Sequence, residues 1–152
     1  MILVSACLLG LDCRYDGGNT ANKELLDFLK DKEFVMVCPE QLGGLQTPRN
    51  PSEISGEDGN AVLENGARVL DNQGMDVTCQ FVKGAKETLK IAKLYNASMA
   101  ILKERSPSCG STKIYDGKFQ GKLKAGKGVT VALLEQNDVK VFSEENYKDM
   151  QL

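Results

Sequence analysis

Residues 2–10 read ILVSACLLG, an apolar run that leads into a cysteine and a glycine-containing turn. Two later segments have the same form: FVMVCPE at 34–40 places Cys38 after an apolar run, and MAILKERSPSCG at 99–110 places Cys109 in the turn beyond one. Short apolar runs bounded by turns are typical of buried parallel strands. Because ligand sites in open α/β sheets lie at the carboxyl ends of such strands, we expect Cys7, Cys38 and Cys109 to meet at one sheet edge.

Helical patterns separate the apolar runs, and this alternation predicts an α/β fold. We expect a single compact domain over residues 1–152, with a mostly parallel sheet flanked by helices and a small β-hairpin. The expected strands are 2–6, 33–38, 99–102 and 139–142. The expected helices are 23–30 with Thr20 or Asn22 as cap, 76–96, 129–135 (for which a strand is the alternative) and 144–150 with Ser143 as cap.

Three further segments have turn-like or loop-like sequences. Residues 39–59 are rich in proline and glycine, and we expect a long stretch without regular structure, which in a compact domain is usually functional. Residues 103–128 predict a second long loop. Residues 61–63 and 68–70, joined across Asn65 and Gly66, predict the β-hairpin.

Composition narrows the functional class. The chain has 152 residues, a net charge of −2, 26% charged and 41% hydrophobic residues. This balance is typical of a globular protein, and the net negative charge argues against nucleic-acid binding. No apolar run approaches membrane-spanning length, and the N-terminus lacks the basic region and cleavage site of a signal peptide. We therefore expect a cytoplasmic protein without membrane contact, in which cysteines act as ligands or catalysts rather than in disulfides. The odd number of cysteines, five, also fits poorly with a complete disulfide framework.

The chain contains no histidine. This absence excludes Ser-His-Asp and Cys-His catalysis and mixed Cys/His zinc sites. A thiolate-only site suits zinc, copper(I) or an iron–sulfur cluster, although buried cysteines without a metal are an alternative. Cys13 is a possible fourth ligand that would close the site, whereas three ligands would leave one metal position open. Cys79, on the apolar stripe of the long helix, is expected to be a core residue.

Four motifs resemble those of the thiouracil desulfidase family: CLLGLDCRYDG, CPEQLGGLQTPRNPSEI, GMDVT and KERSPSCGSTKIYDGKF. The resemblance extends from Val4 to about Leu134. It implies a 4Fe–4S-dependent enzyme that removes sulfur from a thiolated pyrimidine such as 2-thiouracil, giving uracil and sulfide. In that family three cysteines hold the cluster and the fourth iron binds the substrate's sulfur.

Carried over by motif, the resemblance implies Cys7, Cys38 and Cys109 as cluster ligands. It implies Glu40 and Ser106 as the acid–base and substrate-orienting residues, although Ser106 has the alternative of satisfying the backbone of its turn. The implied partners are a small thiopyrimidine substrate and the iron–sulfur assembly machinery. Two alternatives stay open: a desulfidase acting on thiolated nucleosides in tRNA, and a non-catalytic Cys₄ metal-binding or redox module.

Other polar residues have weaker signals. Arg49 is expected in a surface ion pair, with an anion or Glu53 as other partners. Residues 14–16 (RYD) are expected to brace the first loop around the metal. The glycines of KAGKG at 124–128 are compatible with a ligand at the start of the following helix. Five lysines after Cys109 are expected to be solvated, with steering of a nucleotide or tRNA as the alternative: Lys113, Lys118, Lys122, Lys124 and Lys127.

Overall fold

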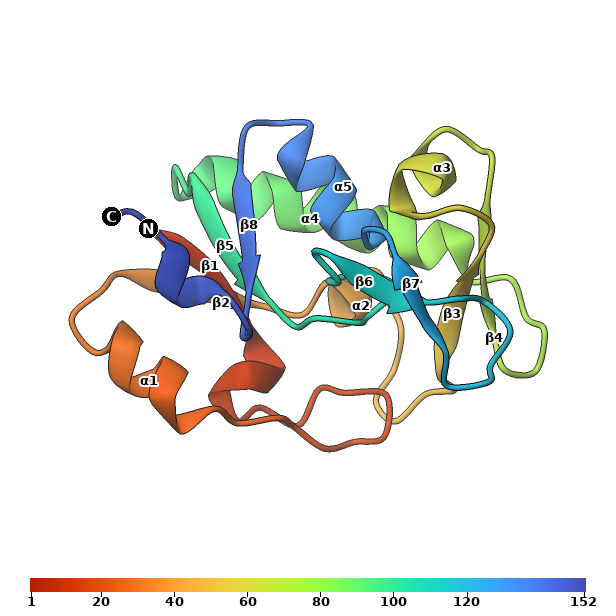
Figure 1. Cartoon of the computed structure of the whole chain (residues 1–152), viewed down its shortest axis with the longest axis horizontal. Helices are drawn as coiled ribbons and strands as arrows, with labels where there is room; N and C mark the ends of the chain where they lie inside the picture. The colour runs from red at the N-terminus through yellow and green to blue at the C-terminus, as the bar shows by residue number, and fades with distance from the viewer.

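The computed structural model describes residues 1–152. Its main sheet has four parallel strands in the order β2-β1-β5-β8, with helices on both sides (Figure 1). The strands are β1 (Ile2–Ser5), β2 (Phe34–Val37), β5 (Met99–Leu102) and β8 (Lys140–Ser143). The predicted α/β class and parallel sheet are therefore confirmed, and each of the four strands overlaps the segment expected for it.

Alternating side chains of the strands face two separate cores, as the twofold repeat of a strand requires. On one face Ile2, Val4 and Ile101 pack with α1 (Lys23–Leu29) and the C-terminal segment, which supply Leu25 and Tyr147 among others. The opposite face packs against α4 (Thr78–Leu94) and α5 (Val129–Glu135), and its core contains Leu3, Ala100 and Leu102. The chain is thus layered as helix, sheet and helix, which leaves the strand ends free to build a site.

Strand β2 differs from expectation in one respect. It is an edge strand rather than a buried one, and Phe34 and Met36 are 38% and 49% exposed.

Asn22 is confirmed as the cap of α1, since its side chain accepts a hydrogen bond from the amide of Leu25 at 3.0 Å. Helix α5 is confirmed as a helix rather than a strand.

The two long segments expected to lack regular structure contain short elements. Residues 39–59 include α2 (Pro39–Leu42) and β3 (Ser52–Ser55), and residues 103–128 include the antiparallel pair β6 (Lys113–Tyr115) and β7 (Leu123–Ala125). The hairpin predicted between 61–63 and 68–70 is wrong in its first strand. Residues 61–63 belong to α3 (Gly59–Leu63), and β4 (Arg68–Asp71) pairs with β3 instead. The side chain of Asp58 explains the helix, because it caps the amides of Asn60 and Ala61.

Two predictions about helices were also wrong. Cys79 is exposed rather than part of the core, because the buried line of α4 runs through Thr78, Phe81, Ala85 and Thr88. The C-terminal segment, expected to be a helix over 144–150, forms only the short 3₁₀ helix η2 (Tyr147–Asp149). Ser143 caps a turn before this helix, because its hydroxyl accepts a hydrogen bond from the amide of Glu145. No helix of the chain is both long enough and apolar enough to span a bilayer.

Candidate active site

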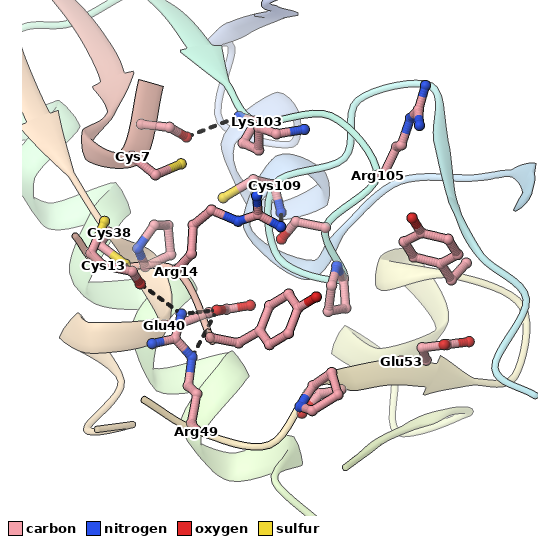
Figure 2. Close-up of a pocket in the computed structure, with 18 of the residues that line it drawn as sticks. Cys7, Cys13, Arg14, Cys38, Glu40, Arg49, Glu53, Lys103, Arg105 and Cys109 are labelled. Carbon is pink, nitrogen blue, oxygen red and sulfur yellow. Dashed lines mark hydrogen bonds and ion pairs between the residues drawn. The ribbon is translucent and has the colours of Figure 1, made fainter. Parts of the chain in front are cut away.

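The carboxyl ends of β1, β2 and β5 border a cavity of about 670 Å³. Cys7, Cys13, Cys38 and Cys109 all line it, together with Glu40 (Figure 2). Ser106 lines the same cavity. Cys79 lies outside this cavity. The geometric part of the prediction is confirmed, since the three thiols that follow apolar runs reach one sheet edge and the possible fourth joins them.

Cys7 lies in the 3₁₀ helix η1 (Ala6–Leu9), which continues directly from β1. Its carbonyl accepts a hydrogen bond from the amide of Thr20 at 2.9 Å, which brings the return of the first loop against it. Lys103, just after β5, is held by Glu144 at 2.8 Å and lies near enough for its charge to favour a Cys7 thiolate. The segments that follow β1 and β5 are therefore close to each other at Cys7.

The thiol of Cys13 lies between those of Cys7 and Cys38. Its hydrogen bond lowers the pKa of Cys38 to about 7, and it also lowers the pKa of Cys7. The hydrogen bonds to Cys38 and Cys7 raise the pKa of Cys13 itself. Burial raises the pKa of Cys109, and the nearby charge of Glu40 adds to that effect. In the metal-free chain the thiols of Cys7 and Cys38 therefore ionise more readily than those of Cys13 and Cys109.

Cys38 and Glu40 are placed by the start of α2. The backbone of α2 packs directly on α4, because a Cβ at Gly84 would lie 2.0 Å from the carbonyl oxygen of Pro39. Gly43 makes the reciprocal approach, where a Cβ would lie 2.0 Å from the oxygen of Gln80. Only glycine permits such contact between helices, so these two residues fix the depth at which Glu40 enters the cavity.

Arg49 is the principal partner of Glu40. Its Nε and Nη2 both bind Oε2 of the carboxylate, while no hydrogen bond reaches Oε1. Nη2 also donates to the Cys13 carbonyl at 2.9 Å, and Nη1 donates to Thr47 Oγ1 at 3.0 Å and to the Gln46 carbonyl at 3.3 Å. The predicted surface ion pair is wrong, because the side chains of Arg49 and Glu40 are only 8% and 16% exposed.

Cys109 lies in a tight turn that its own neighbours and α5 hold. Ser106 Oγ accepts hydrogen bonds from the amides of Ser108 and Cys109, both at 3.1 Å. The first amides of α5 donate to the carbonyls of Pro107 and Ser108. The start of α5 is therefore satisfied by this turn, and the expected approach of a ligand to it is wrong.

Glu104 anchors the other end of the same turn. Its carboxylate is 1% exposed and accepts hydrogen bonds from the amides of Ser111, Thr112 and Lys113 at 2.7–3.3 Å. Hydroxyl groups of Ser111 and Thr112 bind its second oxygen. Burial disfavours the charge, but these bonds outweigh it and hold the pKa of Glu104 at about 2. The carboxylate thus closes the loop that carries Cys109.

Aromatic and basic side chains line the outer part of the cavity. Arg14, Tyr15, Tyr115 and Phe119 belong to this part, and Arg14 lies 5.5 Å from the Tyr15 ring centre. The guanidinium of Arg14 makes no hydrogen bond to protein, whereas Asp16 accepts from the amide of Gly18 at 2.9 Å and so stabilises its own turn. Of the three residues expected to brace the first loop, Asp16 does so locally.

The loop between β6 and β7 is fixed by a carboxylate. Glu53 accepts hydrogen bonds from the amides of Gly117 and Phe119 at 2.9 and 3.2 Å, so it is not a partner of Arg49. Three of the five lysines in this region are also engaged within the chain. Lys113 pairs with Glu145, Lys124 donates to the Gly56 carbonyl, and Lys127 pairs with Glu135.

The cavity offers sulfur donors and no imidazole, the donor set that iron–sulfur clusters take. No group of three or more cysteine, aspartate, glutamate or histidine side chains is arranged to hold a single metal ion. One buried oxygen in the cavity wall, Thr20 Oγ1, has no hydrogen-bond partner in the chain. A group bearing sulfur acceptors would fit both the thiols and this free donor.

Fold and cavity together define an α/β protein with a cavity lined by cysteine thiols at the strand ends of a parallel sheet. The model of the 2-thiouracil desulfurase family matches residues 2–146, and the chain belongs to this family. It is 49% identical over 150 residues to the uncharacterized protein YbbK of Bacillus subtilis (strain 168), covering 99% of each chain. The structure resembles that of the [4Fe-4S]-dependent thiouracil desulfidase TudS, with a TM-score of 0.86 and 42% identity over 97% of this chain and 93% of that one.

Sequence reasoning misjudged Arg49 and missed Glu104, because the contacts of both residues depend on how loops fold together. Arg49 contacts Cys13, which precedes it by 36 residues, and Glu104 contacts a turn seven to nine residues later. Neither contact produces a periodic pattern in the sequence from which it could be predicted. Arg49 lies in the same motif as Glu40, and this proximity was the one available hint.

Proposed function

We propose that this protein converts a thiolated pyrimidine such as 2-thiouracil to the corresponding carbonyl compound and hydrosulfide, using a 4Fe–4S cluster held by Cys7, Cys38 and Cys109. The observation that carries the proposal is the meeting of these thiols with Glu40 in one cavity. Membership of the 2-thiouracil desulfurase family and the likeness to a [4Fe-4S]-dependent desulfidase support it. Residues 1–152 would act as one domain, loaded by the assembly machinery in a reducing compartment such as the cytoplasm.

The overall reaction exchanges sulfur for oxygen without a change in oxidation state, because water supplies the oxygen and both hydrogens of the released H₂S. When bound, the cluster supplies a Lewis-acidic iron with affinity for the thiocarbonyl sulfur. The chain must then activate a water molecule and pass its two protons, one after the other, to the departing sulfur. Glu40 has the geometry for this task.

Arg49 uses Oε2 of Glu40, which leaves Oε1 to accept a proton from water at the substrate carbon. The guanidinium also prevents the carboxylate from rotating, so that its free oxygen keeps one direction. We therefore assign Glu40 as the general base and Arg49 as its positioning residue.

Ser106 is suited to orient the pyrimidine. Its oxygen accepts two amide hydrogen bonds, which leaves the hydroxyl hydrogen free to donate. A donor fixed in this way would bind the remaining carbonyl oxygen of the ring. Both roles that sequence analysis left open for Ser106 are compatible, because the turn and the substrate use different parts of the hydroxyl.

Anaerobic reconstitution tests the proposal. We expect about four irons and four sulfides per chain, as a 4Fe–4S cluster requires, together with sulfide release from 2-thiouracil. Cys7→Ala, Cys38→Ala and Cys109→Ala should each abolish release, whereas Cys79→Ala, on the exposed face of α4, should not. Stoichiometric zinc without sulfide release would leave only a thiolate-metal module.

Cys13→Ala separates a three-cysteine site from a closed four-cysteine site. We expect this variant to keep its iron and most of its turnover, because Cys13 serves the other thiols rather than the cluster. Loss of the cluster in Cys13→Ala, with the Cys79→Ala control intact, would instead assign Cys13 as the fourth ligand.

A further inference from the structure

The hydroxyl of Thr20 is exceptional among the buried polar groups of this chain. Thr20 Oγ1 is the one buried side-chain nitrogen or oxygen without a hydrogen-bond partner. Other buried hydroxyls are satisfied: Thr88 Oγ1 donates to the Gly84 carbonyl at 2.8 Å, and Ser108 and Thr130 bind each other at 2.9 Å. Since an unpaired buried hydroxyl is unfavourable, its position indicates an acceptor that becomes available only when the site is loaded.

The surroundings of Thr20 indicate where that partner lies. Its amide donates to the carbonyl of Cys7 at 2.9 Å, its hydroxyl lies beside the Cys7 thiol, and both residues line the cavity. The backbone bond holds Thr20 in this place whatever its side chain does. Thr20 has no role at the nearby helix, because Asn22 caps α1.

We propose that the Thr20 hydroxyl donates a hydrogen bond to the Cys7 sulfur when Cys7 is a thiolate ligand of the cluster. A thiolate is a much better acceptor than the neutral thiol, so the hydroxyl that already lies beside the Cys7 sulfur gains a strong acceptor when the cluster is bound. This inference rests on the proposed function only in that a cluster must be bound.

Two consequences follow for the loaded protein. A hydrogen bond to a ligand sulfur withdraws electron density from the cluster and favours its reduced form, so it raises the reduction potential. It also holds the thiolate in its ligating orientation, as outer partners of metal ligands commonly do. Neither effect requires substrate, so both can be measured apart from catalysis.

The experiment compares reconstituted wild-type protein with Thr20→Val, which removes the hydroxyl at constant shape, and Thr20→Ser, which keeps it. Thr88→Val is the matched control, since it removes a satisfied hydroxyl from α4. In an EPR-monitored redox titration we expect a lower midpoint potential for Thr20→Val alone. Its cluster should also be lost to an iron chelator about tenfold faster, and Thr20→Ser should behave as wild type.

The melting temperature of the metal-free proteins separates this role from a structural one. Thr20→Val should melt at or above the wild-type temperature, because it loses no hydrogen bond, whereas Thr88→Val should melt lower. A metal-free Thr20→Val that melts well below wild type would assign the hydroxyl a structural role and overturn the inference.

The remaining outcomes are equally decisive. A loaded Thr20→Val with the wild-type potential and chelator rate would overturn the role of Thr20 and leave the desulfidase proposal standing. A wild-type chain that takes up no iron would overturn both. The two failures are thus distinguishable before any substrate is added.

Discussion

Arg49 and Glu40 share one carboxylate oxygen: two nitrogens of the guanidinium bind Oε2, and Oε1 has no partner. This asymmetry gives the two oxygens different functions. One anchors the side chain in the wall of the cavity, and the other is available to a reacting molecule. The pair is nearly buried, so water screens it little.

Glu40→Gln tests the free oxygen. The amide keeps the size of the side chain but cannot take a proton, so we expect turnover to fall about 10²–10⁴-fold while iron content stays at the wild-type value. Steady-state sulfide release and iron analysis of the same preparation measure both. Glu64→Gln, at an exposed position, is the control. Wild-type turnover in Glu40→Gln would remove this residue from the mechanism.

Arg49→Met tests the anchoring oxygen. The substitution leaves the Glu40 charge and the Cys13 carbonyl without their donors, and breaking a buried pair in this way costs about 3–5 kcal/mol. Urea denaturation of the metal-free protein measures the loss. Arg68→Met breaks an exposed ion pair with Asp76 and should cost at most about 1 kcal/mol. An equal loss of unfolding free energy in Arg49→Met and Arg68→Met would contradict the view that the buried contacts of Arg49 stabilise the fold.

Arg49→Lys separates charge from geometry at the same position. Lysine keeps the positive charge but cannot reproduce the five hydrogen bonds of the guanidinium. We expect kcat to fall at least tenfold with little change in KM, because the substrate does not contact Arg49 in the proposed role. A change confined to KM would indicate that Arg49 binds the substrate directly.

Glu104→Gln tests the carboxylate under the Cys109 turn. Because its pKa is lowered from 4.5 to about 2 in the folded chain, its charge contributes about 3 kcal/mol of stability above pH 4.5. That contribution is lost as the pH falls from 4.5 toward 2. We therefore expect wild type to exceed Glu104→Gln in unfolding free energy at pH 7 and the difference to shrink in acid, while exposed Glu57→Gln follows wild type. A difference independent of pH would show that the charge is not responsible.

Cys13→Ala changes the reactivity of its neighbour in the metal-free chain. The hydrogen bond from Cys13 lowers the pKa of Cys38 from 9.0 to about 7, so its removal should return the thiol to its ordinary range. Alkylation requires the thiolate, and we expect Cys38 to react with iodoacetamide roughly tenfold more slowly at pH 7. Mass spectrometry of tryptic peptides gives the rate for each cysteine, with Cys79 as the internal reference. An unchanged Cys38 rate would contradict the hydrogen bond.

Much of the fold could be predicted because its strands are continuous apolar runs. Residues 2–5, 34–37 and 99–102 are such runs, and the position of each following cysteine at the sheet edge is a consequence of parallel pairing. Strand β3 could not be found in this way. Its sequence, SEIS, is polar, and it becomes a strand only because β4 pairs with it from sixteen residues away.

The site was predictable in its thiols but not in its supports. Asn65 and Gly66 correctly indicated a turn, yet the Asp58 cap turned the preceding residues into a helix. The contacts of Arg49 and Glu104 depend on how separate loops meet, which no local pattern encodes. A sequence motif therefore locates the reactive groups, and only the assembled loops show what holds them.

The position of each proposed ligand beyond a different strand also orders events in time. Cys7, Cys38 and Cys109 follow β1, β2 and β5, and β5 enters the sheet only after most of the chain exists. A nascent chain that ends before residue 109 lacks the third cysteine and cannot provide all three sulfur ligands. In the proposed three-cysteine site, cluster loading must therefore wait until at least residue 109 of the 152 has been synthesised, and a loaded cluster would indicate that β1, β2 and β5 have come together.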